Sequence, residues 1–202
     1  MTWSIAQGVI SRSASDWLNT RYRGYQKGDV SELTICGEMV QVYAGLREEE
    51  LRQAAARYIS EFLPSRLFAE MAELVERLRS QGAEIWAVSS TNKWVVAEGV
   101  RALGIPEDRI LAAEIRSVNG VLTEELIDVP TDEQKAAALR RVGLSNPDAV
   151  FGNSVHDLAM LEIAHHPYPV NPSPALLQTA QERGWRCFMP HSVDEQSSVG
   201  GE

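Results

Sequence analysis

The stretch Phe151–Glu162, F-G-N-S-V-H-D-L-A-M-L-E, decides the fold. The apolar run 149–152 is short enough for a buried strand, and it leads into Gly-Asn-Ser, after which Asp157 opens a helix. The oxygen atoms of Asn153 and Asp157 are then expected one turn apart at a strand end, which suits a hard cation that keeps several waters. A Gly-Asn turn followed by an acid in the first turn of a helix would also explain each residue, although not the whole cluster.

Outward from this stretch, strands and helices alternate through the second half of the chain, after Gly82. The expected strands are 84–89, 149–152, 167–170 and 186–189, and a hairpin is expected over 110–127 around Asn119-Gly120. The expected helices are 92–103, 131–142, 157–165 and 174–184, with Thr131 as the N-cap of the second. This alternation predicts an α/β fold with a parallel sheet of Rossmann-like type.

The first half of the chain has a helical rhythm instead. Apolar residues at helical spacing predict helices over 13–27, 30–43, 47–62 and 65–80. We therefore expect a helical lobe over residues 1–64, an α/β core over 65–190, and a Ser- and Gly-rich disordered tail over 191–202.

Two further groups of polar residues are expected at the carboxyl edge of the sheet, where open α/β sheets bind ligands. Ser89 and Ser90 follow the strand 84–89, and their hydroxyls together with free N–H groups of the next helix could bind phosphate oxygens. Helix capping explains the same residues. Lys135 stands on the first turn of a helix, where it is either a solvated surface cation or a cation aimed at a phosphoryl group.

Composition and charge exclude several classes of protein. A net charge of −9 argues against binding to nucleic acids or anionic membranes, although it allows a small phosphorylated substrate. The two cysteines, Cys36 and Cys187, are too few for a disulfide framework, which favours a reducing cytoplasm. We expect neither a signal peptide nor a membrane helix, because Met1–Ile10 lacks a basic and apolar leader pattern and no apolar run approaches ~20 residues. No G-x-G-x-x-G follows a strand, which disfavours a nucleotide-dependent oxidoreductase.

A strand-end Ser, a downstream Lys and a strand ending in G-N-S-x-x-D occur here in the order that resembles motifs two, three and four of the haloacid dehalogenase superfamily. The branch like phosphoserine phosphatase, with a helical cap, is the most similar. The resemblance implies that Ser89, or Ser90 in the neighbouring register, binds the phosphate, and that Lys135 steadies the nucleophile and the developing charge. It implies that Asn153 and Asp157 help to hold Mg²⁺, and that residues 1–64 form the cap that selects the substrate.

The sequence departs from the family's pattern in two ways. Asn153 stands where the family more often has Asp, so weaker metal binding is expected. The family's first motif, D-x-D at the end of a central strand, is absent from all 202 residues. That strand belongs between those at 84–89 and 149–152, so its loss would leave buried backbone groups unpaired, at about 1–3 kcal/mol each. We therefore expect a truncated chain or a misplaced start rather than an evolved pseudoenzyme.

The leading hypothesis from sequence is a Mg²⁺-dependent phosphomonoester hydrolase that acts on a small phosphorylated metabolite through an Asp nucleophile. As given, the chain is expected to be inactive. The alternative is a non-catalytic protein that binds phosphate or a metabolite on the same fold. A dehalogenase ranks lower, because dehalogenases need no metal and the donors at 153 and 157 are spaced for one.

Overall fold

The computed structural model describes residues 8–64 and 66–191. Contacts divide the chain into two compact units, one formed by Met1–Glu61 with Trp86–Pro130 and the other by Phe62–Ile85 with Thr131–Glu202. These units are not bounded where the cap and core were expected to be, at residue 64, so the assignment of a cap stays a prediction. The predicted tail lies outside the described residues, apart from His191.

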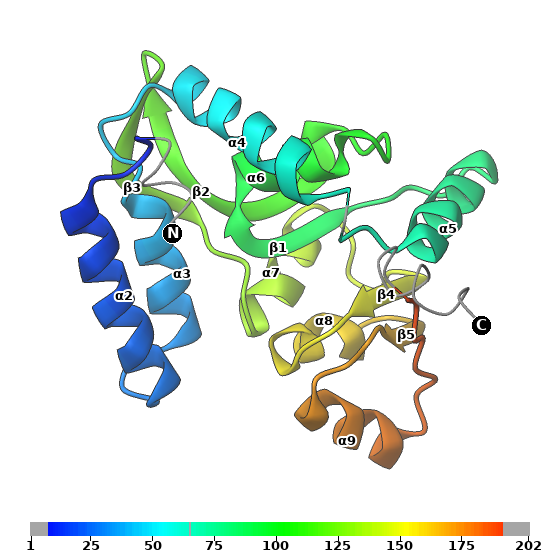
Figure 1. Ribbon diagram of the computed structural model, residues 1–202. Coiled ribbons are helices and arrows are strands. Elements are labelled where there is room, and N and C mark those ends of the chain that lie inside the picture. Colours follow the sequence, from blue (N-terminus) through cyan, green and yellow to red (C-terminus); the bar gives the residue numbers. More distant parts are fainter. Residues whose placement is uncertain (1–7, 65, 192–202) are drawn as a thin grey trace, which may run out of the picture. The chain divides into compact units, whose positions relative to one another are not determined.

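Three helices begin the first unit: α2 (Arg12–Gln26), α3 (Glu32–Gln41) and α4 (Glu48–Phe62). Ser11 and Ser31 cap the first two, because each Oγ accepts a hydrogen bond of 3.1 Å from the backbone N–H three residues on. Gly28, with φ of 82°, allows the tight turn between these helices, which lie side by side (Figure 1). All three helices were predicted, within a few residues at each end.

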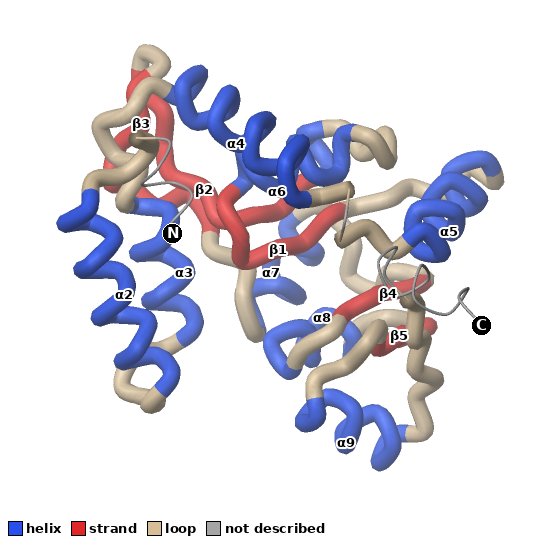
Figure 2. Tube along the Cα trace, in the orientation of Figure 1, coloured by secondary structure: helices blue, strands red, loops and turns tan. Residues whose placement is uncertain are grey.

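The sheet of this unit has the order β1 (Ala87–Asn92), β2 (Ile110–Val118) and β3 (Val121–Asp128), coloured red in Figure 2. β1 and β2 are parallel, and β2 and β3 form an antiparallel hairpin. The turn residues Asn119 and Gly120 have φ of 51° and 77°, the left-handed backbone that this dipeptide tolerates. The predicted hairpin is therefore confirmed.

One hydrophobic cluster holds the first unit together. Helix α3 packs on all three strands and contributes Ile35 and Val40, while α4 contributes Leu51. Trp94 comes from α6 (Lys93–Arg101), which connects β1 to the short 3₁₀ helix η1 (Glu107–Arg109). Only 2% of the Trp94 surface is exposed, and its Nε1–H donates to Glu48 at 3.1 Å, so the buried indole N–H is satisfied.

The second unit contains a two-stranded parallel sheet and surrounding helices. Its elements are α5 (Ala69–Ser80), α7 (Glu133–Arg141), β4 (Ala149–Gly152), the 3₁₀ helix η2 (Val155–Asp157), α8 (Leu158–Glu162), β5 (His166–Pro169) and α9 (Pro174–Arg183). Helix α8 packs on both strands and on α7, and Leu161 and Leu176 are fully buried. No described residue of α5 is buried, although the sequence predicts an apolar packing stripe there.

The predicted α/β class with parallel strand pairs is confirmed. Among the described residues, β1 pairs only with β2 and β4 only with β5. No helix in the described part of the chain is long and apolar enough to cross a membrane.

Two predicted strands need correction. The first runs over Ala87–Asn92 instead of 84–89, because its ladder with β2 begins at Ala87. The last, expected at 186–189, is reduced to a single bridge between Val170 and Phe188. Its neighbour β5 contains two prolines, which have no N–H to donate, and this restricts the ladder that a third strand could form.

Candidate active site

The polar centre of the second unit is a buried ion pair between Lys135 and Asp157. Lys135 Nζ lies 2.5 Å from Asp157 Oδ1, and the two residues are 7% and 3% exposed. Lys135 is in the first turns of α7, as predicted, but it is not the solvated surface lysine that was the alternative. Two charges buried to this degree are tolerated only when they are paired, and here each compensates the other.

The second oxygen of Asp157 organises the loop that precedes it. Asp157 Oδ2 accepts hydrogen bonds from the backbone N–H of Asn153 at 2.8 Å and of Ser154 at 3.0 Å, as part of a capping box. Gly152 makes room for this carboxylate, since a Cβ there would lie 2.6 Å from Asp157 Cβ. The G-N-S-x-x-D pattern thus folds locally around one acid, which explains why the residue before Asn153 is glycine.

A second interaction beside this centre was not foreseen from the sequence. His156 Nδ1 lies 2.7 Å from Asp132 Oδ1, and Asp132 has φ of 48°, a backbone region that favours glycine. Thr131 was predicted to cap α7, but the N-cap is Asp132, and the buried Thr131 Oγ1 has no hydrogen-bond partner among the described residues. The positive φ of Asp132 redirects the chain at this point, and no local sequence signal reveals it.

The described residues do not complete a magnesium site by themselves. Asn153 and Asp157 offer oxygen donors, but both Asp157 oxygens already accept hydrogen bonds. No group of three or more His, Cys, Asp or Glu residues that could hold a metal ion occurs in residues 8–64 and 66–191. Mg²⁺ prefers octahedral coordination by six oxygens, several of them from water, so this pair is only a fraction of the ligand set.

The predicted phosphate ligands, Ser89 and Ser90, lie in the first unit. Ser89 is the last residue of β1 in regular register with β2, and the register shifts between Ser89 and Asn92. Ser90 and Thr91 therefore stand at an irregularity of the strand, a feature that is frequent beside functional sites. Ser89 Oγ accepts from Thr91 N at 3.1 Å, while Asn92 caps α6 by accepting from Val95 N at 3.0 Å. The capping alternative thus applies to Asn92 and not to the two serines.

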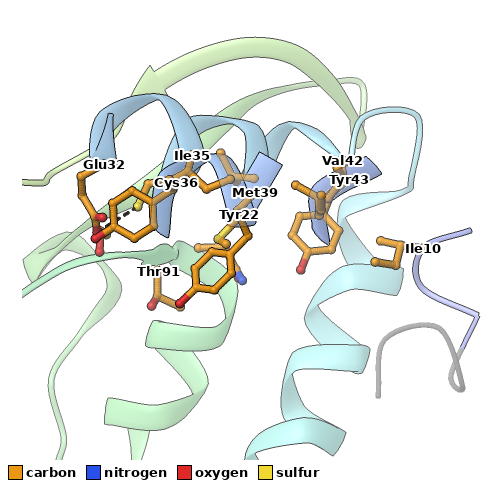
Figure 3. A pocket seen from close by; sticks show the side chains of 14 residues that line it. Ile10, Tyr22, Glu32, Ile35, Cys36, Met39, Val42, Tyr43 and Thr91 are labelled. Atoms are coloured by element: carbon orange, nitrogen blue, oxygen red, sulfur yellow. Dashed lines mark hydrogen bonds between the residues drawn. The ribbon is translucent and has the colours of Figure 1, made fainter. Parts of the chain in front are cut away.

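Ser90 and Thr91 also line a groove within the first unit (Figure 3). A cavity of about 370 Å³ between α2, α3 and the end of β1 contains both residues together with Tyr22, Tyr25 and Glu32. A second cavity of about 470 Å³, on the side of α4, is lined by Tyr58 and shares five lining residues with the first: Tyr22, Met39, Tyr43, Thr91 and Asn92. We call the two together the aromatic groove.

One carboxylate sits among these aromatic residues. Glu32 Oε1 accepts a hydrogen bond of 3.5 Å from Cys36 Sγ, the dashed line in Figure 3. A hydrogen bond to Glu32 raises the pKa of the Tyr25 hydroxyl above its ordinary value of 10.0, and burial raises it further. Tyr25 therefore stays protonated at neutral pH and presents its O–H to the acid.

The structure thus brings Lys135, Asn153 and Asp157 together in the second unit and places Ser89 and Ser90 in the first. The family model of the haloacid dehalogenase-like hydrolases matches residues 12–162, three quarters of the chain. The chain belongs to this family. The matched region contains the predicted Ser, Lys and G-N-S-x-x-D in the expected order, and the resemblance seen in the sequence is confirmed.

Several curated relatives of the chain are named phosphatases. A probable phosphatase of Mycobacterium tuberculosis is 27% identical over 152 residues, which make up 73% of this chain and 52% of that protein. A histidinol-phosphatase of Neisseria meningitidis is 23% identical over 192 residues, 90% of this chain and 86% of that protein. The chain spans about half the length of the first relative and most of the second.

Solved structures share the fold. A Bordetella pertussis protein of unknown function superposes with a TM-score of 0.79 at 22% identity, covering 92% of this chain and 87% of that one. A probable phosphoserine phosphatase from Vibrio cholerae gives 0.65 at 18% identity, covering 95% and 58%. These neighbours support the haloacid dehalogenase fold of the phosphoserine-phosphatase-like kind.

Proposed function

We propose that this member of the haloacid dehalogenase-like hydrolase family derives from a Mg²⁺-dependent phosphatase that hydrolyses a small phosphorylated metabolite. The observation that carries the proposal is the buried Lys135–Asp157 pair with Asn153 beside it. A lysine this deeply buried is more than a solubilising surface charge, and a fixed cation can stabilise the charge that develops on a transferring phosphoryl group. The phosphatase names of the relatives support the same class of reaction.

In this proposal each predicted residue has a separate task. Lys135 is the catalytic cation and contacts the phosphoryl group, and Ser89, with Ser90 as its neighbour, hydrogen-bonds a phosphate oxygen. Asn153 and Asp157 contribute to the binding of Mg²⁺, together with ligands that the described residues do not supply. The helices before residue 64 act as the cap.

The nucleophile is the part that the 202 residues do not contain, because no D-x-D pair occurs in them. In the proposed mechanism an aspartate attacks phosphorus and forms an acyl phosphate as the P–O bond of the ester breaks and its alcohol leaves with a proton. Water then hydrolyses the acyl phosphate to inorganic phosphate and the free aspartate. The chain by itself is therefore expected to be inactive. This same observation favours a second candidate, a non-catalytic protein that binds phosphate or a metabolite through Ser89 and Lys135.

The test compares the 202-residue chain with a product extended by the codons that precede Met1 in frame. Both are assayed for hydrolysis of p-nitrophenyl phosphate with Mg²⁺ and with EDTA, and Lys135→Ala is made in each. We expect activity only in the extended product and only with Mg²⁺. In the extended product, Lys135→Ala should lower this activity by a factor of at least about 100, because the variant removes one contact to the transition state. An inert extended product that contains D-x-D contradicts the proposal. If the 202-residue chain instead binds phosphate without turnover and no such extension is encoded, the second candidate holds.

A further inference from the structure

We propose that the pair of Asp132 and His156 is a clamp that positions the buried Lys135 ammonium. This role also accounts for the unfavourable backbone conformation of Asp132. The two residues act through the Lys135–Asp157 pair and do not contact the substrate, so they are positioning residues. The catalytic consequence rests on the proposed function, whereas the clamp itself concerns only contacts within the second unit.

The first argument is that two bridges join the same two elements. Asp132 is the N-cap of α7, and Lys135 lies in the first turn of that helix, while the partners of both are consecutive residues of η2. The outer bridge places His156 Nδ1 2.7 Å from Asp132 Oδ1. The inner bridge places Lys135 Nζ 2.5 Å from Asp157 Oδ1. A movement at one end of the outer bridge therefore also acts on the inner one.

The second argument is the backbone link between the two bridges. The carbonyl oxygen of Asp132 accepts a hydrogen bond of 3.1 Å from the backbone N–H of Lys135, so the two residues are fixed to each other. A lysine ammonium sits at the end of a flexible four-carbon stem, and its position depends on how firmly the backbone beneath it is held. On the other side, Asp157 Oδ2 accepts the N–H groups of residues 153 and 154. Loss of the outer bridge should therefore loosen this closed network from the side of α7.

The third argument is the conformation of Asp132. Its φ of 48° and ψ of −128° lie in a backbone region that glycine adopts freely and that a residue with a Cβ adopts only at a cost. Such conformations persist where the surrounding structure imposes them, and they cluster at functional sites. The clamp is also partly exposed, since 30% of the His156 side chain and 49% of the Asp132 side chain are accessible. A pair exposed to this degree contributes little to overall stability, so stability does not explain an aspartate where glycine would fit.

The test is amide hydrogen exchange of the 202-residue chain and its variants, measured by NMR at neutral pH. Asp132→Gly removes the carboxylate but relieves the backbone, which offsets the entropy that glycine adds to the unfolded chain, so the midpoint of urea unfolding should not fall. The amides of Asn153 and Ser154, which donate to Asp157, should nevertheless exchange at least about tenfold faster. This factor corresponds to the loss of about one hydrogen bond to a charged group.

Three controls separate positioning from a general loss of structure. Asp132→Asn should keep the wild-type exchange rates of both amides, because its side-chain oxygen accepts from His156 Nδ1–H and asparagine tolerates positive φ. Thr131→Val alters the neighbouring residue, whose buried hydroxyl has no hydrogen-bond partner among the described residues, and should also leave both rates unchanged. The amide of Leu177, which donates to Ser173 O at 2.8 Å in the same unit, serves as internal reference.

The clamp is overturned by unchanged exchange in Asp132→Gly, by an equal acceleration at Leu177, or by an acceleration in Asp132→Asn as large as in Asp132→Gly. In an active extended product, Asp132→Gly should lower kcat for p-nitrophenyl phosphate at least about tenfold and change KM less than about twofold, because Lys135 acts on the transition state. An unaffected kcat there would overturn the catalytic role. Since exchange requires no hydrolysis, an inert extended product counts only against the proposed phosphatase.

Discussion

The two units treat their polar groups in opposite ways. In the second unit, Lys135, Asp157 and the N–H groups of the 153–154 loop are paired with one another and largely hidden from water. In the first unit, the polar groups at Ser90, Thr91 and Glu32 line an open groove. A closed network contributes to the fold itself, so a substitution in it lowers the stability strongly. The residues of an open groove can be exchanged with little loss of stability.

The largest expected effect is the loss of the acid in the closed network. Asp157→Ala leaves the Lys135 ammonium buried without a partner and removes the acceptor of two backbone N–H groups. The free energy of unfolding of the second unit should therefore fall by about 3–5 kcal/mol. Urea denaturation followed by circular dichroism measures this. The control Glu50→Ala breaks an exposed pair with Arg47 and should cost no more than about 1 kcal/mol. Similar small losses in both variants would refute the contrast between the units.

Substitution of one glycine in each unit by alanine should change the stability by an intermediate amount, with opposite signs in the two units. Gly152→Ala forces a Cβ to within 2.6 Å of Asp157 Cβ, and we expect a loss of about 1–3 kcal/mol through displacement of the acid. In Gly99→Ala, within α6, the new methyl would lie 3.6 Å from Ile59 Cδ1, an ordinary van der Waals contact, and the helix should gain about 0.5–1 kcal/mol of stability. Thermal unfolding of the two variants distinguishes them. A stabilising Gly152→Ala would mean that the loop around Asp157 is not closely packed.

The smallest effect concerns the pH dependence of the first unit. Burial alone would raise the pKa of Glu48, but hydrogen bonds from Trp94, Ser117 and Arg52 outweigh it and hold that pKa below its ordinary value of 4.5. A lowered pKa in the folded state means that this stabilisation is present above pH 4.5 and is lost as the pH falls through the folded value. In urea titrations between pH 6 and 3, the free energy of unfolding should fall less steeply with decreasing pH in Glu48→Gln than in the wild type. The exposed Glu49→Gln serves as control, and identical slopes in all three proteins would exclude the effect.

Local patterns were sufficient for most of the elements. The Asn119-Gly120 hairpin followed from residues that tolerate positive φ, and the helices followed from apolar spacing that a single helix face must satisfy. The start of β1 could not be predicted from local patterns, because it depends on where Ile110 and Leu111 offer pairing partners. Those residues are distant from β1 in the sequence. The 186–189 segment failed as a strand for the same kind of reason, since the prolines of β5 limit the ladder beside it.

In the candidate site, the order Ser89, Lys135, Asn153 and Asp157 was readable because each residue stands at or near a boundary between a strand or loop and a helix. The aromatic groove could not be predicted from the sequence, because the residues that line it come from four separate elements: Tyr22, Glu32, Tyr58 and Thr91. The interaction of His156 with Asp132 was also missed, since it joins residues 24 positions apart through a backbone turn of positive φ.

The sequence by itself determined the family and the α/β class and predicted which residues carry the chemistry, because these depend on local spacing and on the order of short motifs. Only the tertiary structure decided that Lys135 is buried against Asp157 and that an acid lies among tyrosines in the first unit. Burial and charge environment arise when elements that are far apart in the chain pack together and exclude water, and no local pattern encodes that outcome.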